Sequence, residues 1–205
     1  MIVYTFSMDK KAETLKAYNQ GAKEFAHKFD QMGTLAQDVD KAFSYFHKKN
    51  AKVLEIGCGN GRDAKEILKH TSNYLGIDIA EELIKIAKIN LPAAHFEAQD
   101  FETYEFPPNL DIIFAFASLL HINKENLKSV LDKAWNRLND KGIFFISLQY
   151  DSYQEKIKAD EHGERTFYFY TPKLIEELAA SRYKKVYEEL RNFKGQEWFI
   201  IILQK

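Results

Sequence analysis

The chain has 205 residues, 45% of them hydrophobic and 14% aromatic, which is ample for one packed domain and marginal for two. A formal net charge of -1 excludes a strongly basic field, so nucleic acid is a disfavoured partner and no membrane association is expected. A lone cysteine excludes an intrachain disulfide. The start lacks a signal-peptide pattern and no apolar run reaches membrane-spanning length, so we expect a cytoplasmic protein.

The first 50 residues have a helical pattern. Apolar residues recur at spacings of three and four and form one face, made of Leu15, Tyr18, Ala22, Phe25 and Phe29. After a break at Gly33, a second stretch repeats the rhythm with Leu35, Val39, Ala42 and Phe46. We expect residues 1–50 to form a helical lid.

From residue 51 onward, short apolar runs alternate with helical patterns. The predicted strands cover residues 53–56, 74–78, 95–98, 111–118 and 142–149. The predicted helices lie near residues 64–68, 83–87 and 123–138, with Asn123 as the N-cap of the third. Repeated strand–helix units predict an α/β fold with a mostly parallel sheet and helices on both faces.

The end of the chain departs from this alternation. A helix is predicted near Pro172, followed by two strands over residues 184–191 and 197–205. So short a connection cannot join parallel strands, and the two must form an antiparallel hairpin. Before them, residues 150–171 form a long polar and aromatic segment, which predicts a lid-like loop on the substrate side. The alternative for this segment is a β-excursion whose side chains alternate between two faces.

Three glycines, Gly57, Gly59 and Gly61, follow the first predicted strand and precede a helix. Glycines there allow unusual backbone angles and let a ligand approach the main chain, while the helix offers free N–H groups to an anion. In open α/β sheets, ligands bind beyond the carboxyl ends of the strands. The loop therefore suits a ligand with a small anionic or zwitterionic part, although a glycine turn by itself is also compatible with a plain tight turn.

Two acids end the next two strands. Asp78 can accept hydrogen bonds from both ribose hydroxyls, and Asp100 can accept one from an adenine amino group, with Phe101 as an apolar wall. Together with the glycine loop, these residues indicate a site for an adenosine attached to something small and charged.

The stretches "VLEIGCGNGRDA", "YLGIDIA", "AQDF", "DIIFAFASLLHI" and "LNDKGIFFISL" resemble the successive motifs of class I S-adenosylmethionine-dependent methyltransferases, over about residues 50 to 205. The resemblance implies a Rossmann-like seven-stranded sheet with a reversed last strand, S-adenosylmethionine as cofactor and S-adenosylhomocysteine as product. Within the class, "GNGRDA" and "ASLLHI" look like small bacterial enzymes loosely grouped with tellurite-resistance-type methyltransferases. We therefore predict one methyltransferase domain over residues 1–205, with a lid at 1–50 and a core at 51–205.

The resemblance also implies roles for single residues. It assigns the methionine end of the cofactor to the glycine loop, the ribose to Asp78, the adenine to Asp100, and the organisation of the loop and of the cofactor's amino end to Glu55. The remaining predicted cofactor-binding residues are Tyr18, Cys58, Arg62, Asp63, Ile79, Phe101, Ala115 and Phe116. For Cys58 simple packing is an alternative, and for Arg62 and Asp63 a surface ion pair and ordinary helix capping are alternatives.

Methyl transfer from a sulfonium is an in-line displacement that depends on alignment, so neither a triad nor a metal is required, and no metal-ligating spacing is visible. His121, just past the fourth strand, is the candidate general base, with a packing role as its alternative. Tyr18 could close over the sulfonium by a cation–π contact. Candidate substrate contacts are Tyr150, His162, Arg165 and Tyr168, and Arg165 would suit an acidic group.

Three other functions share parts of this pattern. A nicotinamide-dependent oxidoreductase is disfavoured because the glycines run G-x-G-x-G and no second catalytic domain is evident. A non-catalytic S-adenosylmethionine-binding subunit or sensor would look the same around the cofactor. Nucleic-acid methylation is disfavoured because "FASLLH" stands where an Asn/Asp-Pro-Pro-aromatic motif is expected, which favours a small-molecule acceptor. The acceptor atom and the oligomeric state stay open.

Overall fold

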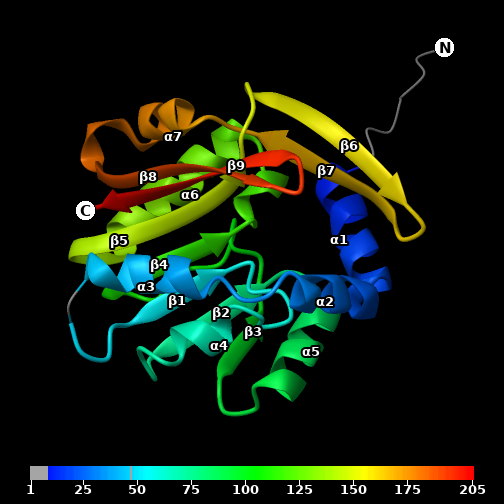
Figure 1. The fold of residues 1–205 in the computed structure, drawn as a ribbon, viewed down its shortest axis with the longest axis horizontal. Helices are drawn as coiled ribbons and strands as arrows, with labels where there is room; N and C mark the ends of the chain where they lie inside the picture. Colours follow the sequence, from blue (N-terminus) through cyan, green and yellow to red (C-terminus); the bar gives the residue numbers. More distant parts are fainter. Residues whose placement is uncertain (1–8, 47) are drawn as a thin grey trace.

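A seven-stranded sheet forms the centre of the computed structural model, which describes residues 9–46 and 48–205 (Figure 1). The strand order is β3-β2-β1-β4-β5-β9-β8. The strands are β1 (Val53–Ile56), β2 (Tyr74–Asp78), β3 (His95–Ala98), β4 (Leu110–Phe116), β5 (Leu138–Gln149), β8 (Lys184–Phe193) and β9 (Gln196–Gln204). Neighbours from β3 to β5 are parallel, whereas β9 is antiparallel to both β5 and β8. The predicted mostly parallel sheet with a reversed last strand is confirmed.

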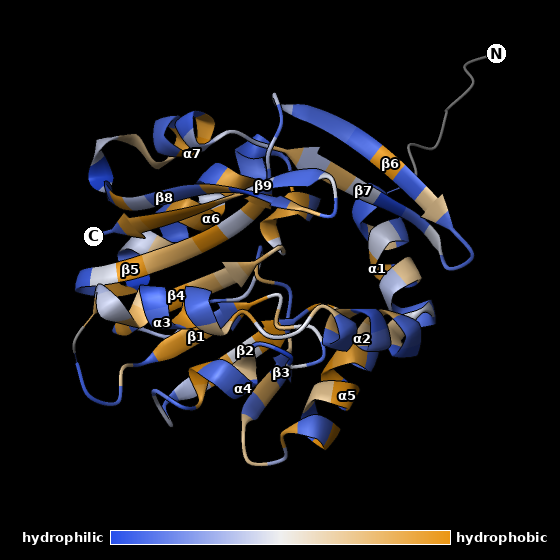
Figure 2. Ribbon diagram, in the orientation of Figure 1, coloured by the Kyte–Doolittle hydropathy of each residue, from blue (hydrophilic) through white to orange (hydrophobic). Residues whose placement is uncertain are grey.

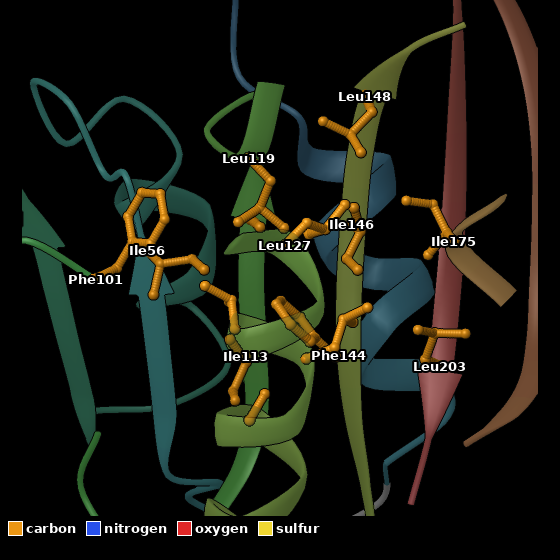
Figure 3. Close-up of a cluster of buried hydrophobic side chains, with 14 of the residues drawn as sticks. Ile56, Phe101, Ile113, Leu119, Leu127, Phe144, Ile146, Leu148, Ile175 and Leu203 are labelled. Atoms are coloured by element: carbon orange, nitrogen blue, oxygen red, sulfur yellow. The ribbon is translucent and has the colours of Figure 1, made fainter. Parts of the chain in front are cut away.

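Helices cover both faces of this sheet. Along the chain, the α-helices are α1 (Lys10–Gln20), α2 (Ala22–Gln31), α3 (Ala36–Ser44), α4 (Ala64–Ile67), α5 (Glu81–Asn90), α6 (Lys124–Arg137) and α7 (Pro172–Ala179), of which α3 to α7 pack on the sheet faces. Residues of α6 and α7 pack on one face of the sheet, in the cluster that Figure 3 shows around Ile113, Leu127 and Phe144. Residues of α3, α4 and α5 pack on the other face.

The central strands are hydrophobic because both of their faces are buried. Every residue of β1 and of β4 is buried, including the single carboxylates Glu55 and Asp111. This burial explains why these strands are continuous apolar runs rather than alternating patterns. In Figure 2 the middle of the sheet is accordingly the most hydrophobic part of the ribbon.

Capping residues set where two helices begin. Asn123 Oδ1 accepts a hydrogen bond from the backbone N–H of Asn126 at 2.8 Å, as its position predicted. Thr171 caps α7 in the same way: its Oγ1 accepts a hydrogen bond from the backbone N–H of Leu174, and Pro172 is the first residue of the helix. Both helices start directly after a segment that lies at the carboxyl edge of the sheet.

The predicted first helix is divided at Gly21, which ends α1 and begins α2. A Cβ atom at this position would lie 2.6 Å from the ring of His162 and 2.7 Å from that of Phe25. The break therefore lets a distant turn approach the backbone closely. Phe46, predicted on the second helical face, lies beyond the end of α3. Residues 1–8 of the predicted lid, and residue 47, lie outside the described residues.

Residues 150–171 are not a loop. They contain an antiparallel hairpin of β6 (Gln154–Asp160) and β7 (Gly163–Phe169), so the β-excursion is what the chain adopts. The hairpin lies alongside α1 (Figure 1), where the backbone N–H of Thr166 donates to Thr14 Oγ1 at 3.0 Å and Lys10 pairs with Glu155 at 2.6 Å. The loop prediction was wrong because alternating polar and aromatic residues also form a half-buried strand.

The turn between β8 and β9 is shorter than predicted. Lys194 and Gly195 alone connect the strands, and both have positive φ values, 52° and 82°. Such angles belong to the tight turns that match the twist of a hairpin. Since β9 is reversed, this turn lies at the same edge of the sheet as the carboxyl ends of β1 and β4. Across residues 9–46 and 48–205, no helix combines the length and apolarity needed to cross a membrane.

Candidate functional site

A cavity of about 480 Å³ lies at the carboxyl edge of the sheet, a size typical of small-molecule sites. Its walls come from α1, the end of α2, the ends of β1, β2 and β4, the β7 strand and the β8–β9 turn. The predicted site residues that line it are Tyr18, Glu55, Gly57, Cys58, Gly59, Arg62, Asp63, Asp78, Ile79, Asp100, Phe101, Phe116, His121 and Arg165. The cavity thus joins the predicted cofactor residues to the candidate base and to one candidate substrate contact.

The glycine loop is held in place by the neighbouring strands. Gly57 has a φ of 72°, and a Cβ there would lie 2.1 Å from the side chain of Ser118. Ser118 in turn donates a hydrogen bond to the carbonyl oxygen of Ile56 at 2.7 Å. Gly57 is therefore needed for the close contact between β1 and the segment after β4, as much as for any ligand.

Gly59 has a different role. Its φ is 54°, and the nearest atom to a Cβ there would be the ring of Phe29 at 3.8 Å. Its backbone N–H donates to Asp78 Oδ2 at 2.9 Å, while Asp78 Oδ1 accepts from Ala80 N at 2.8 Å. Burial raises the pKa of Asp78 above its usual value, and these backbone donors oppose that shift. Each oxygen keeps a lone pair, so the carboxylate can still accept from a ribose.

Glu55 is 1% exposed at the end of β1. Burial, reinforced by the nearby charge of Asp63, raises its pKa to about 8. The hydroxyl of Tyr74 donates to Glu55 Oε2 at 2.5 Å. Glu55 consequently holds a proton near neutral pH, and a positive charge placed beside it would lower its pKa and release that proton to solvent.

Asp100 forms an ion pair with Lys11, a residue that the sequence did not indicate as part of the site. Its Oδ2 accepts from Lys11 Nζ at 2.5 Å and its Oδ1 from the backbone N–H of Glu102 at 3.0 Å. Lys11 also pairs with the carboxylate of Glu102. The start of α1 is thereby fastened to the segment after β3, beside Phe101.

Arg62 and Asp63 pair with each other, Nη2 to Oδ2, at 2.5 Å. Asp63 Oδ1 accepts from the backbone N–H of Leu35 at 3.0 Å, and the Asp63 side chain makes no capping hydrogen bond to α4. Arg62 does form an ion pair, but with a largely buried partner at the cavity wall rather than at the surface, and the capping alternative for Asp63 is not what the structure shows. Both residues also line the cavity, so contact with a ligand is still compatible with the structure.

Cys58 is 5% exposed and its thiol has a raised pKa because of burial, so it packs as a neutral side chain at the cavity wall.

His121 lies in the short 3₁₀ helix η1 (Leu119–His121) after β4. Its Nδ1 lies 2.7 Å from the carbonyl oxygen of Thr166, which can only accept, so Nδ1 carries the proton. Its Nε2 lies 2.9 Å from the Tyr18 hydroxyl and accepts from it. Removal from bulk water lowers the pKa of His121 to about 4 and raises that of Tyr18 to about 12. The pair is neutral at pH 7.

Five predicted site residues do not line the cavity, which corrects the expectation of direct contact. Ala115 points into the core cluster beneath α6 and is 0% exposed, because it alternates with Phe116 along β4. Gly61 packs against Phe96 and Ala87. His162 packs on the Phe25 ring and pairs with Glu24. Tyr150 packs edge-on against Phe199, and Tyr168 stacks with Tyr153.

Other cavity residues were missed by the sequence analysis. They include Lys11, Thr14, Asn60, Ser118 and Gln149, and Phe193, Lys194, Gln196 and Trp198 around the β8–β9 turn. The residues of the β8–β9 turn could have been predicted from the sequence. Because the last strand is reversed, the turn before it must lie at the carboxyl edge of the sheet. No sequence pattern identifies Lys11 or Gln149 as cavity residues, because their positions depend on contacts between distant segments.

Residues 53–142 match a family model described as a methyltransferase domain. An uncharacterized methyltransferase of Bacillus thuringiensis is 30% identical over 162 residues, covering 74% of this chain and 71% of that one. Malonyl-[acyl-carrier protein] O-methyltransferase 2 of Ilyobacter polytropus is also 30% identical, over 68% of this chain and 52% of its own length. The chain spans about half the length of the malonyl-carrier relatives that it matches.

The fold has solved counterparts. The 1,6-didemethyltoxoflavin-N1-methyltransferase of Burkholderia thailandensis superposes with a TM-score of 0.73 at 17% identity, covering 95% of this chain and 88% of that one. A methyltransferase from Methanosarcina mazei gives 0.70 at 16% identity, covering 80% and 96%. The expected Rossmann-like methyltransferase fold is confirmed, while the grouping with tellurite-resistance-type enzymes stays a prediction. This chain belongs to the class I S-adenosylmethionine-dependent methyltransferases.

Proposed function

We propose that this protein binds S-adenosylmethionine and catalyses transfer of its methyl group to a small-molecule acceptor. One observation carries the cofactor proposal most directly: the Asp78 carboxylate is fixed by the N–H of Gly59 and the N–H of Ala80 at the wall of a 480 Å³ cavity. The Asp78 carboxylate and the open glycine loop together fit the ribose and the small charged tail of such a cofactor. Asp100 and Phe101 fit its adenine.

The roles of the chain's own residues follow from their chemistry. Asp78 would accept from the ribose hydroxyls and Asp100 from the adenine amino group. Deprotonated Glu55 would compensate the charge of the amino group, and the backbone from Gly57 to Asn60 would hold the methionine end. When bound, the cofactor supplies an electrophilic methyl group on a positively charged sulfur. The Tyr18 ring would lie against that charge.

The proton of the acceptor needs a destination as its lone pair forms the new bond to carbon. Both nitrogens of His121 are engaged, Nδ1 by Thr166 and Nε2 by Tyr18. An acceptor X–H therefore donates to the Tyr18 oxygen, while the Tyr18 proton moves to His121 Nε2. This relay leaves a neutral tyrosine and a protonated histidine, which returns its proton to solvent after product leaves.

By their names, one relative methylates malonyl-[acyl-carrier protein] and one structural counterpart methylates the small molecule 1,6-didemethyltoxoflavin, which supports a small acceptor group. A non-catalytic cofactor-binding role is the alternative, and it predicts binding without formation of S-adenosylhomocysteine when acceptors are added. Cytoplasmic location also stays a prediction.

Calorimetry with S-adenosylmethionine, S-adenosylhomocysteine and NAD tests the cofactor assignment. We expect the first two to bind and NAD not to bind. Asp78→Asn should weaken S-adenosylhomocysteine binding roughly 10- to 100-fold, because an amide has one acceptor oxygen and cannot serve two backbone donors and both ribose hydroxyls. Asp132→Asn is the matched control, since Asp132 pairs with Lys128 and Arg182 on the far side of α6. Binding of NAD, or equal affinity in both variants, would overturn the proposal.

A further inference from the structure

Charge is divided between the two walls of the cavity. The lining acids Glu55, Asp63, Asp78, Asp100 and Glu102 all belong to the segments that end β1, β2 and β3. Two lining cations, Lys11 and Arg62, are paired with acids of that same wall. The other two, Arg165 and Lys194, come from β7 and from the β8–β9 turn, where no acid lines the cavity within the described residues.

Arg165 is held in a fixed orientation. Its guanidinium carbon lies 4.5 Å from the ring centre of Phe25, 5.5 Å from that of Tyr18 and 5.7 Å from that of Phe167. Three rings around one guanidinium restrict its rotation and keep water from it. The side chain is 15% exposed, and Asp160, which does not line the cavity, pairs with it from outside, so its charge is only partly compensated.

The hydrogen-bonding capacity of Arg165 is only partly used. Nη2 donates to Asp160 Oδ2 at 2.5 Å, whereas the buried Nε has no hydrogen-bond acceptor in the protein. An unpaired buried donor of this kind costs free energy, on the order of 1–3 kcal/mol. Because Arg165 lines the cavity, an anionic oxygen of a ligand there could pair with its guanidinium group.

Gln149 supplies a second unmatched polar atom on the same side. It ends β5, pairs in register with Trp198 of β9, and lines the cavity, yet its buried Oε1 receives no hydrogen bond from the protein. The neighbouring wall is aromatic, with Phe167, Phe193 and Trp198. This half of the cavity therefore combines an aromatic wall with two polar side chains, Arg165 and Gln149, whose hydrogen-bonding capacity the protein does not fully use.

We propose that the methyl acceptor is a small organic anion, with an apolar body against the aromatic wall and a negatively charged oxygen group bound by Arg165. The inference rests on the proposed function, because it assigns the acceptor side of the same cavity. The guanidinium lies within 6 Å of the Tyr18 ring, so the anchoring group and the atom that receives the methyl are separated by only a few bonds. An ammonium group at the anchoring position is disfavoured because it would repel the guanidinium of Arg165.

Ligand-observed NMR on the protein saturated with S-adenosylhomocysteine tests this without knowledge of the natural acceptor. The probes are aromatic carboxylates such as phenylacetate and indole-3-acetate, each matched with its primary amide and its amine. We expect carboxylates to bind at least tenfold more tightly than their amides and amines not to bind. Arg165→Met should remove this preference, and Arg182→Met, the same change at an ion pair on the outer surface, should keep it.

The possible outcomes distinguish failure of the acceptor inference from failure of the proposed function. If S-adenosylhomocysteine binds but carboxylates show no preference over amides, or if the preference survives Arg165→Met, the acceptor inference is wrong and the proposed function stands. The wild-type preference is itself decisive should the variant fail to fold. If S-adenosylhomocysteine does not bind to the wild-type chain, the proposed function is wrong and the acceptor inference is overturned with it.

Discussion

The hydroxyl of Tyr18 lies 2.9 Å from Nε2 of His121, and this contact joins α1 to the segment after β4 across 103 positions of the chain. The ring planes are nearly perpendicular, at 77°, so the hydroxyl meets the lone pair of the imidazole rather than its face. With Nδ1 bound to the carbonyl of Thr166, the histidine has one tautomer and one accessible partner. Tyr18 is therefore the group through which an acceptor would reach the base.

Removing either member of this pair should slow turnover. We expect Tyr18→Phe and His121→Gln each to lower kcat by roughly 100-fold, the scale of general acid–base catalysis, with little change in S-adenosylhomocysteine affinity. The double variant should be no slower than the single variants, because the two residues act as one relay. Single-turnover formation of S-adenosylhomocysteine, with an acceptor from the carboxylate screen, measures this. Independent, multiplicative losses would contradict a shared relay.

The pH dependence of kcat should reflect the depressed pKa of His121. An ordinary histidine near 6.5 would give an acid limb in the neutral range. Because burial lowers the pKa of His121 to about 4, the imidazole stays neutral and able to accept a proton well below pH 6. We expect a flat profile from pH 8 to about 5.5. An acid limb centred between pH 6 and 7 that disappears in His121→Gln would show that the histidine is more solvated than its surroundings imply.

Cofactor binding should release a proton from Glu55. In the free protein its pKa of about 8 leaves the carboxyl about nine-tenths protonated at pH 7. A bound ammonium lowers that pKa, so deprotonation accompanies binding. Calorimetry at pH 7 in buffers of different ionisation enthalpy should show release of close to one proton, decreasing as the pH rises above 8. Glu55→Gln serves as the control and should abolish the release; an unchanged value would assign the proton to another group.

Gly57→Ala should destabilise the fold more than Gly33→Ala. Both positions have positive φ, 72° and 74°, so both variants carry the same backbone cost of roughly 1–2 kcal/mol. At Gly57 the new methyl would also lie 2.1 Å from the Ser118 side chain, whereas nothing lies within 4 Å at Gly33. Overpacking adds roughly 1–3 kcal/mol at Gly57. Urea unfolding measures the free energy of unfolding of both variants. Equal losses of stability would mean that the Ser118 side chain moves away from the new methyl at no cost.

The sequence predicted the central sheet well because local patterns define it. The run Val53–Ile56 is buried on both faces, and the acids that end the next two strands, Asp78 and Asp100, lie at the predicted edge. The prediction that both Arg165 and Tyr168 contact substrate was wrong, and the alternation of side chains along a strand could have shown this from the sequence. In β7, Arg165 and Phe167 share one face and Tyr168 takes the other, so Arg165 and Tyr168 could not both line one cavity.

Other parts of the site could not be predicted from local patterns. Lys11 reaches Asp100 only because α1 lies across the end of the sheet, and the residue spacing within α1 says nothing about that position. The close contact of Gly21 with His162 likewise joins positions 141 residues apart in the chain. Such contacts arise from tertiary packing, which a single sequence does not reveal.

The reversal of β9 has a consequence for engineering. It brings a two-residue turn, rather than the start of a helix, to the cavity wall, with Phe193 43% exposed and open space around Gly195. A hairpin tip tolerates insertions and substitutions that a buried strand does not. The length and sequence of the Phe193–Gln196 tip can therefore be changed to reshape this wall, while the buried strands that position Asp78 and the glycine loop keep their packing.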